Sequence, residues 1–69
     1  MLSELERILI GGLKLCGLKQ DDIVATLNLL QTEEQQWAMV DYLETVVEKP
    51  PGRTEVFKKA AEIRVMIVL

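Results

Sequence analysis

The sequence contains no histidine and one cysteine, Cys16. Without a second cysteine there is no internal disulfide, and the cysteine usage gives no sign of an oxidising compartment. Without histidine the chain lacks the base of Ser-His-Asp and Cys-His systems and the commonest nitrogen ligand of zinc. We therefore expect a protein that is not an enzyme and holds no cofactor or metal. Cys16 falls on an apolar helix face, where a buried, inert thiol is the ordinary outcome.

Aromatic residues and long apolar runs are also scarce. Aromatic residues make up 4% of the 69 residues, against 49% for hydrophobic residues as a whole, so the core must be aliphatic. The longest uninterrupted apolar run is Val65 to Leu69, far short of the roughly 20 residues that cross a bilayer. Acidic residues interrupt the apolar N-terminal stretch, unlike in a signal peptide. These features predict a soluble, cytoplasmic protein with no membrane contact, forming one domain over residues 1–69.

The spacing of apolar residues predicts four helices. They cover residues 3–16, 20–30, 32–48 and a last segment from residue 55 towards the C-terminus. Gly17 follows the first helix at the position where a left-handed residue is favoured, and Pro50 with Pro51 ends the third. Gly11-Gly12 lies within the first helix without the spacing of a phosphate-binding loop, so we expect these glycines to let a neighbouring helix approach closely.

Three predicted helices also carry start signals. Ser3 with Glu6 and Thr32 with Gln35 have the spacing of capping boxes, in which each side chain satisfies a backbone N–H of the first turn. Thr54 has the character of an N-cap for the last helix. The sequence therefore predicts an all-α fold, a compact four-helix domain. Because only two residues separate the second and third helices, we expect a helix-turn-helix corner between them.

A helix-turn-helix corner raises the possibility of a transcription regulator that binds DNA or another regulator. In that motif the second helix enters the major groove, with cations nearby to contact phosphates. Here that helix carries acidic residues and no lysine or arginine before Lys49, and the net charge of the chain is −3. The missing basic footprint weighs against nucleic acid as a partner.

The last predicted helix has more apolar surface than a small bundle needs. One stripe faces the core, and a second lies beside it, formed by Phe57, Ala61, Val65 and Val68. The tail from residue 63 has three interpretations: a helix packed across the bundle, a homodimer interface, or an edge strand, which would also need a partner strand. The second stripe predicts self-association, most simply as a homodimer.

A further candidate surface lies on the third predicted helix. Trp37 flanks its apolar stripe, and Asp41 and Glu44 follow one turn later and give the surface an acidic rim. A tryptophan there either covers the edge of the core or anchors a partner, because tryptophan is frequent at binding hot spots. A basic or amphipathic protein segment would suit this surface. The sequence thus favours a small intracellular protein–protein interaction module that self-associates through its C-terminal helix.

Overall fold

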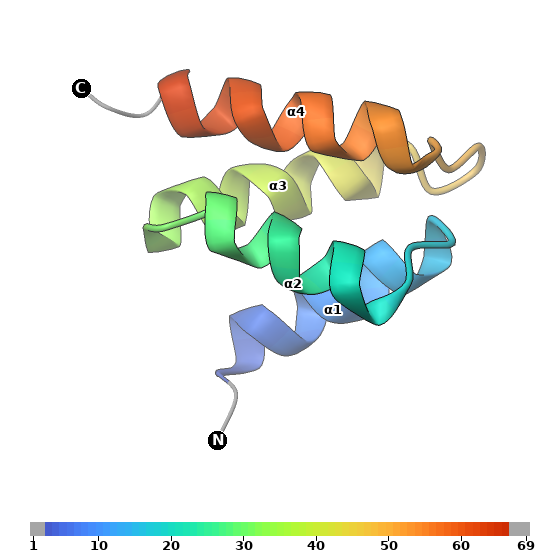
Figure 1. The fold of residues 1–69 in the computed structure, drawn as a ribbon, viewed down its shortest axis with the longest axis horizontal. Helices are drawn as coiled ribbons and strands as arrows, with labels where there is room; N and C mark the ends of the chain where they lie inside the picture. Colours follow the sequence, from blue (N-terminus) through green and yellow to red (C-terminus); the bar gives the residue numbers. More distant parts are fainter. Residues whose placement is uncertain (1–2, 67–69) are drawn as a thin grey trace.

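The computed structural model describes residues 3–66. Within this range the chain is all-α and contains no strand, which confirms the predicted fold class. Its radius of gyration, 10.9 Å, agrees with the value of about 11 Å expected for a compact domain of this length. The four helices, shown in Figure 1, are α1 (Glu4–Leu15), α2 (Gln20–Leu29), α3 (Glu33–Thr45) and α4 (Arg53–Met66).

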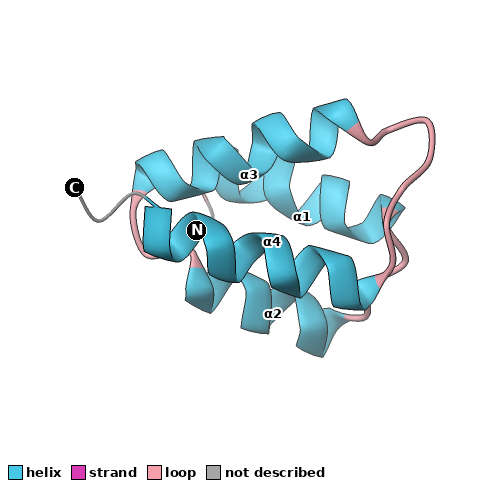
Figure 2. Ribbon diagram, turned by 90° about the horizontal axis from the view of Figure 1, so that it is seen from above, coloured by secondary structure: helices cyan, strands magenta, loops and turns pink. Residues whose placement is uncertain are grey.

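The helices form a four-membered bundle in which neighbours in space are not always neighbours in sequence. Helix α1 packs mainly against α3, and α2 mainly against α4, while the α3–α4 and α1–α2 contacts complete the ring (Figure 2). Residues 30–32 connect α2 to α3, yet each of these helices makes its main packing contact elsewhere. The helix-turn-helix corner therefore stays a prediction.

The turn between α2 and α3 is held by a complete capping box, as predicted. The Thr32 hydroxyl accepts a hydrogen bond from the Gln35 N–H (3.1 Å), and Gln35 Oε1 accepts from the Thr32 N–H (3.1 Å). The same Oε1 accepts from the Gln31 N–H at 2.7 Å. The predicted Ser3–Glu6 box forms only in part. The Ser3 hydroxyl accepts a hydrogen bond from the Glu6 N–H, as expected. The Glu6 carboxylate, however, accepts from the Ser3 hydroxyl and not from the Ser3 backbone N–H.

The end of α1 matches the sequence signal at Gly17. This glycine has a φ of +81°, in the left-handed region where a side chain would be strained. Its N–H donates to the Lys14 carbonyl, and the Leu18 N–H donates to the Leu13 carbonyl. These two bonds define a Schellman motif, and buried Leu18 supplies the apolar contact that accompanies it.

Two helix boundaries differ from the prediction around the proline loop. Helix α3 ends at Thr45, so residues 46–48 form turns instead of a last helical turn. The Thr45 hydroxyl donates to the Tyr42 carbonyl at 2.7 Å, and three β-branched residues in a row, 45–47, extend a helix poorly. Helix α4 begins at Arg53, with the Val56 N–H donating to the Gly52 carbonyl, so Thr54 lies inside the first turn and is not the N-cap.

The core is aliphatic, as the composition requires, and all four helices contribute to it. Two valines, Val24 and Val47, are exposed, whereas Thr26 is fully buried and its hydroxyl donates to the Asp22 carbonyl at 2.8 Å. The bonded hydroxyl lets a polar residue occupy the inner face of α2. The buried apolar residues are Leu5, Leu9, Leu13, Leu18, Ile23, Leu30, Met39, Val40, Leu43, Val56, Ala60 and Ile63.

Gly12 lies where α1 packs closely against the Leu43 side chain of α3. A Cβ atom at this position would lie 2.9 Å from Leu43 Cδ1, closer than real Cβ contacts, whereas a Cβ at Gly11 would meet nothing within 4 Å. The expectation of close helix approach is thus confirmed for Gly12 and wrong for Gly11. The close approach brings the apolar faces of α1 and α3 together around Leu43.

Helix α4 is attached through polar contacts as well as its apolar face. Buried Gln35 of α3 donates from Nε2 to the Arg64 carbonyl at 3.3 Å, near the end of α4. At the other end, Arg53 Nε lies 2.9 Å from Asp22 Oδ1 of α2, and the Arg53 guanidinium also lies 5.2 Å from the Phe57 ring centroid. The Gln35 bond and the Arg53–Asp22 ion pair thus link the two ends of α4 to α3 and α2, whereas the Arg53–Phe57 contact lies within α4.

Candidate functional site

The predicted self-association stripe lies on the outer side of α4. Phe57 is half-buried, Ala61 is exposed, and Val65 is 74% exposed. Ala61 and Val65 line a shallow hollow together with Lys58 and Glu62. The fourth predicted member, Val68, lies outside the described residues. The described part of the stripe is thus a narrow apolar strip between charged side chains.

The three residues of the predicted acidic patch all reach the surface of α3. Trp37 is 49% exposed, so about half of its side chain is covered by the protein and half is in contact with solvent. Asp41 lines a hollow beside α4 that also includes Tyr42 and Lys59. Glu44, one turn along, lines a different hollow beside α1. Asp41 and Glu44 therefore border two separate depressions.

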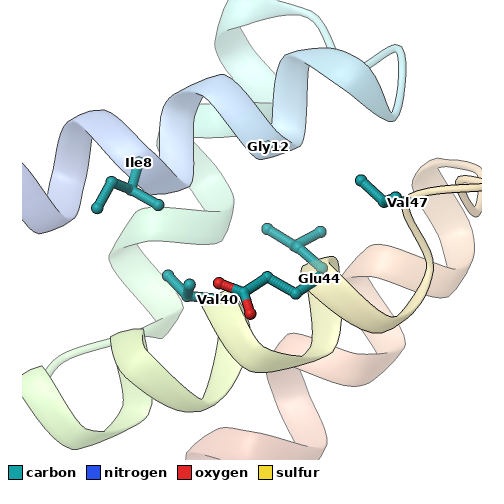
Figure 3. Close-up of a pocket in the computed structure, with 6 residues that line it drawn as sticks. Ile8, Gly12, Val40, Glu44 and Val47 are labelled. Atoms are coloured by element: carbon teal, nitrogen blue, oxygen red, sulfur yellow. The ribbon is translucent and has the colours of Figure 1, made fainter.

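A groove lies between α1 and α3, and the sequence pattern did not indicate it. Figure 3 shows Ile8 on α1 facing Val40 and Glu44 on α3, with Val47 just beyond the end of α3. The hollow at its centre has a volume of about 110 Å³ and walls that are almost entirely apolar. Its lining residues are Ile8, Gly12, Val40, Leu43, Glu44 and Val47.

The groove continues towards the end of α1 as a second, smaller depression. Leu15, Cys16, Val46 and Pro50 join the shared residues there. Three of the exposed large apolar side chains lie along this path: Ile8 (44% exposed), Val47 (60%) and Leu15 (70%). Burial raises the pKa of the half-buried Cys16 thiol above its ordinary value, so the thiol stays protonated and adds no charge.

The electrostatics of the groove come from one side chain. Among the described residues that line its two depressions, Glu44 carries the only charge. Helix α3 contributes four acidic residues, Glu33, Glu34, Asp41 and Glu44, and no lysine or arginine. An apolar floor with an acidic edge is a surface suited to contact with another chain, since exposed apolar area gains from burial and the carboxylate selects for a cation.

The sequence signal for this groove was incomplete. Ile8 and Gly12 lie beside the buried stripe of α1, and Val47 lies at the edge of the apolar stripe of α3. Each position is unremarkable until α1 and α3 are known to be neighbours. Helix pairing in the bundle is the missing piece of information, because periodicity assigns faces to helices but does not assign their partners.

Residues 3–66 contain no group of three or more His, Cys, Asp or Glu side chains that could hold a metal ion. None of the helices in that range has the length and apolar character needed to cross a membrane. Comparisons with protein-family models, curated proteins and solved structures find no match to the chain. Its surface chemistry is therefore the basis for a functional proposal.

Proposed function

We propose that the protein is a small, non-enzymatic protein–protein interaction module of the cytoplasm that self-associates through α4. The observation that carries this proposal is the exposure of Val65, at 74%, next to exposed Ala61 on the outer side of α4. Apolar side chains on one face of a helix gain free energy when a second apolar surface removes them from water.

The α4 face has the composition that a twofold contact needs. In a symmetric dimer the same patch occurs on both sides, so it must complement itself. An antiparallel pair of α4 helices crossing at Ala61 would place the small Ala61 side chains at the closest point. Phe57 of one copy would then face Val65 of the other, and Lys58 with Glu62 would provide charges of both signs at the edges.

Light scattering over a dilution series tests the proposal. We expect the chain to have the mass of a dimer at high concentration, and Val65→Asp to give a folded monomer because it buries a charge in the interface. Val24→Asp is the matched control, since Val24 is exposed on α2 and its replacement should leave the mass unchanged. A wild-type chain that is monomeric throughout the series would refute self-association, as would equal loss of dimer in both variants.

The alternative function is a helix-turn-helix-like transcription regulator that binds DNA or another regulator. The short connection between α2 and α3 is what favours it. The four acidic residues of α3, without any basic residue in that helix, weigh against phosphate contact. Binding to duplex DNA that weakens steeply as salt is raised would support the alternative over the interaction module.

A further inference from the structure

We propose that the groove between α1 and α3 binds an amphipathic helix of a partner protein, with apolar side chains in the groove and a lysine or arginine against Glu44. This inference rests on the proposed role as an interaction module and specifies a partner class for it. It does not depend on self-association through α4, which uses the face of a different helix.

The shape of the groove supports an aliphatic anchor. Val40 and Leu43 are its buried lining residues, and the exposed Ile8 and Val47 lie toward its two ends. Figure 3 shows Ile8 and Val47 in these positions. A dry cavity of about 150 Å³ in another protein accepts benzene, so a hollow of about 110 Å³ has room for one leucine or isoleucine side chain. The two buried lining residues are already covered, whereas Ile8 and Val47 remain exposed and would gain from being covered.

The length of the groove supports a helix as the occupant. The exposed apolar residues on α1, Ile8 and Leu15, are seven residues apart, which corresponds to two helical turns. A helix lying in the groove would present side chains at positions i, i+3 or i+4, and i+7 to this stretch, the usual spacing of helix-in-groove anchors. Val47 and the smaller depression around Pro50 would accept the last of these side chains.

The charge distribution supports a basic occupant. Glu44 is the one charged side chain among the described residues lining the groove, and no lysine or arginine lines either depression. The acidic character extends over α3 and over the chain, whose net charge is −3. A cation near Glu44 would be drawn to the groove and would fix the register of the helix, because opposite charges steer association and penalise wrong alignments.

A second copy of this chain fits the groove less well than a separate partner helix does. Helix α4 has more basic than acidic residues, but its larger aliphatic side chains, Val56 and Ile63, are buried in its own core. The hollow on its described outer face offers Ala61 and Val65, which are smaller than the leucine or isoleucine side chain that the groove has room for. The partner we propose therefore has larger apolar side chains in its stripe and basic residues along both sides of it.

The probe for the test is a synthetic amphipathic helix of about 18 residues, with leucines at helical spacing and lysines on both sides, titrated into the full chain. We expect methyl NMR shifts to map to Ile8, Val40 and Val47. Val47→Asp should abolish binding, and Glu44→Lys should weaken it about tenfold through charge reversal. Val47 and Glu44 are both exposed, and unfolding curves will show that each variant is folded.

Asp41→Lys is the matched control, because it makes the same charge change on the same helix but outside the groove. We expect it to change the dissociation constant less than twofold. Equal weakening by Asp41→Lys, equal binding of a peptide with glutamates in place of lysines, or shifts confined to α4 would each overturn the groove proposal. So would dilution-dependent shifts at Ile8 and Val47 in the chain alone, which would assign the groove to a second copy.

The two proposals fail separately. A wild-type chain that is monomeric but binds the lysine peptide at Ile8 and Val47 refutes self-association and leaves the groove proposal standing. A dimer that Val65→Asp dissociates, but that does not bind the peptide, refutes the groove proposal and leaves self-association standing.

Discussion

The contact between α1 and α3 and the attachment of α4 are built from different interactions. Among residues 3–66, α1 and α3 share no side-chain hydrogen bond or ion pair, and they meet through aliphatic side chains around Gly12 and Leu43. Helix α4 adds the Gln35 bond to the Arg64 carbonyl and the Arg53–Asp22 ion pair to its apolar contacts. The Lys59 ammonium also lies 5.4 Å from the Tyr42 ring centroid.

Apolar contacts and hydrogen bonds have different physical roles in the bundle. Apolar contact is non-directional and depends on shape, so the α1–α3 pair should be sensitive to added volume. Hydrogen bonds are directional, so burial of the polar Gln35 side chain destabilises the fold unless its hydrogen-bond partners are correctly placed. We interpret the polar contacts as the features that fix how α4 lies on the bundle. The α1–α3 contact leaves an apolar groove at the surface, and α4 has its own apolar strip on the outside.

The largest effect is expected at the α1–α3 contact. Gly12→Val should lower the free energy of unfolding by about 2–3 kcal/mol, because its side chain would overlap the Leu43 side chain and disturb the packing of α1 on α3. Gly11→Val is the matched control: it faces open space, and replacing a helical glycine there should stabilise the protein by a few tenths of a kcal/mol. Urea unfolding of the two variants measures the difference.

If the two glycine variants unfold at the same urea concentration, then Gly12 is not needed where α1 packs against Leu43. The α1–α3 contact would then be as tolerant of volume as the exposed face of α1. A loss of stability in Gly12→Val alone would show that the α1–α3 contact depends on shape.

An intermediate effect is expected at Gln35. Gln35→Met keeps the side-chain length but removes three hydrogen bonds: those from the Gln31 and Thr32 N–H groups and the one to the Arg64 carbonyl. We expect a loss of about 1–2 kcal/mol, since three part-buried hydrogen bonds are lost, two of them from the capping interactions at the start of α3. Gln36→Met removes one bond, to the Leu30 carbonyl, and should cost less. Equal losses of unfolding free energy in the two variants, measured by urea unfolding, would show that the bond from Gln35 to the Arg64 carbonyl does not stabilise the protein.

The sequence allowed the helices to be predicted because their signals are local. The Thr32–Gln35 capping box and the left-handed Gly17 depend on residues a few positions apart, and both occur as expected. The early end of α3 was missed because the proline pair looked like the stop, whereas Thr45 and the following β-branched residues end the helix first. Such competition between nearby stop signals is not resolved by periodicity.

The groove could not be predicted because it depends on contacts between distant segments. Ile8 and Val40 become neighbours only through the packing of α1 on α3, and sequence periodicity leaves that pairing open. The burial of Thr26 has a different, local cause: its hydroxyl donates to the Asp22 carbonyl within α2, which lets a polar side chain face the core. The predicted patch at Trp37, Asp41 and Glu44 contained one groove residue, Glu44, and its role in partner binding stays a prediction.

The smallest effect, expected at alkaline pH, also distinguishes the two regions. Burial raises the pKa of Cys16, on the α1 side, above 9.0, and burial together with Glu55, Cys16 and Glu62 raises that of Tyr42, which faces α4, above 10.0. Both groups lose their proton more readily in the unfolded chain. The contribution of these two groups to the free energy of unfolding should therefore be constant at neutral pH and fall as pH rises into the alkaline range where they lose their protons. Cys16→Ala should remove the thiol's part of the loss and, because the Cys16 charge also raises the pKa of Tyr42, a share of the Tyr42 part. Tyr42→Phe should remove the part that belongs to the phenol. Urea unfolding across this pH range measures both, and identical slopes in the two variants would mean that neither region is responsible.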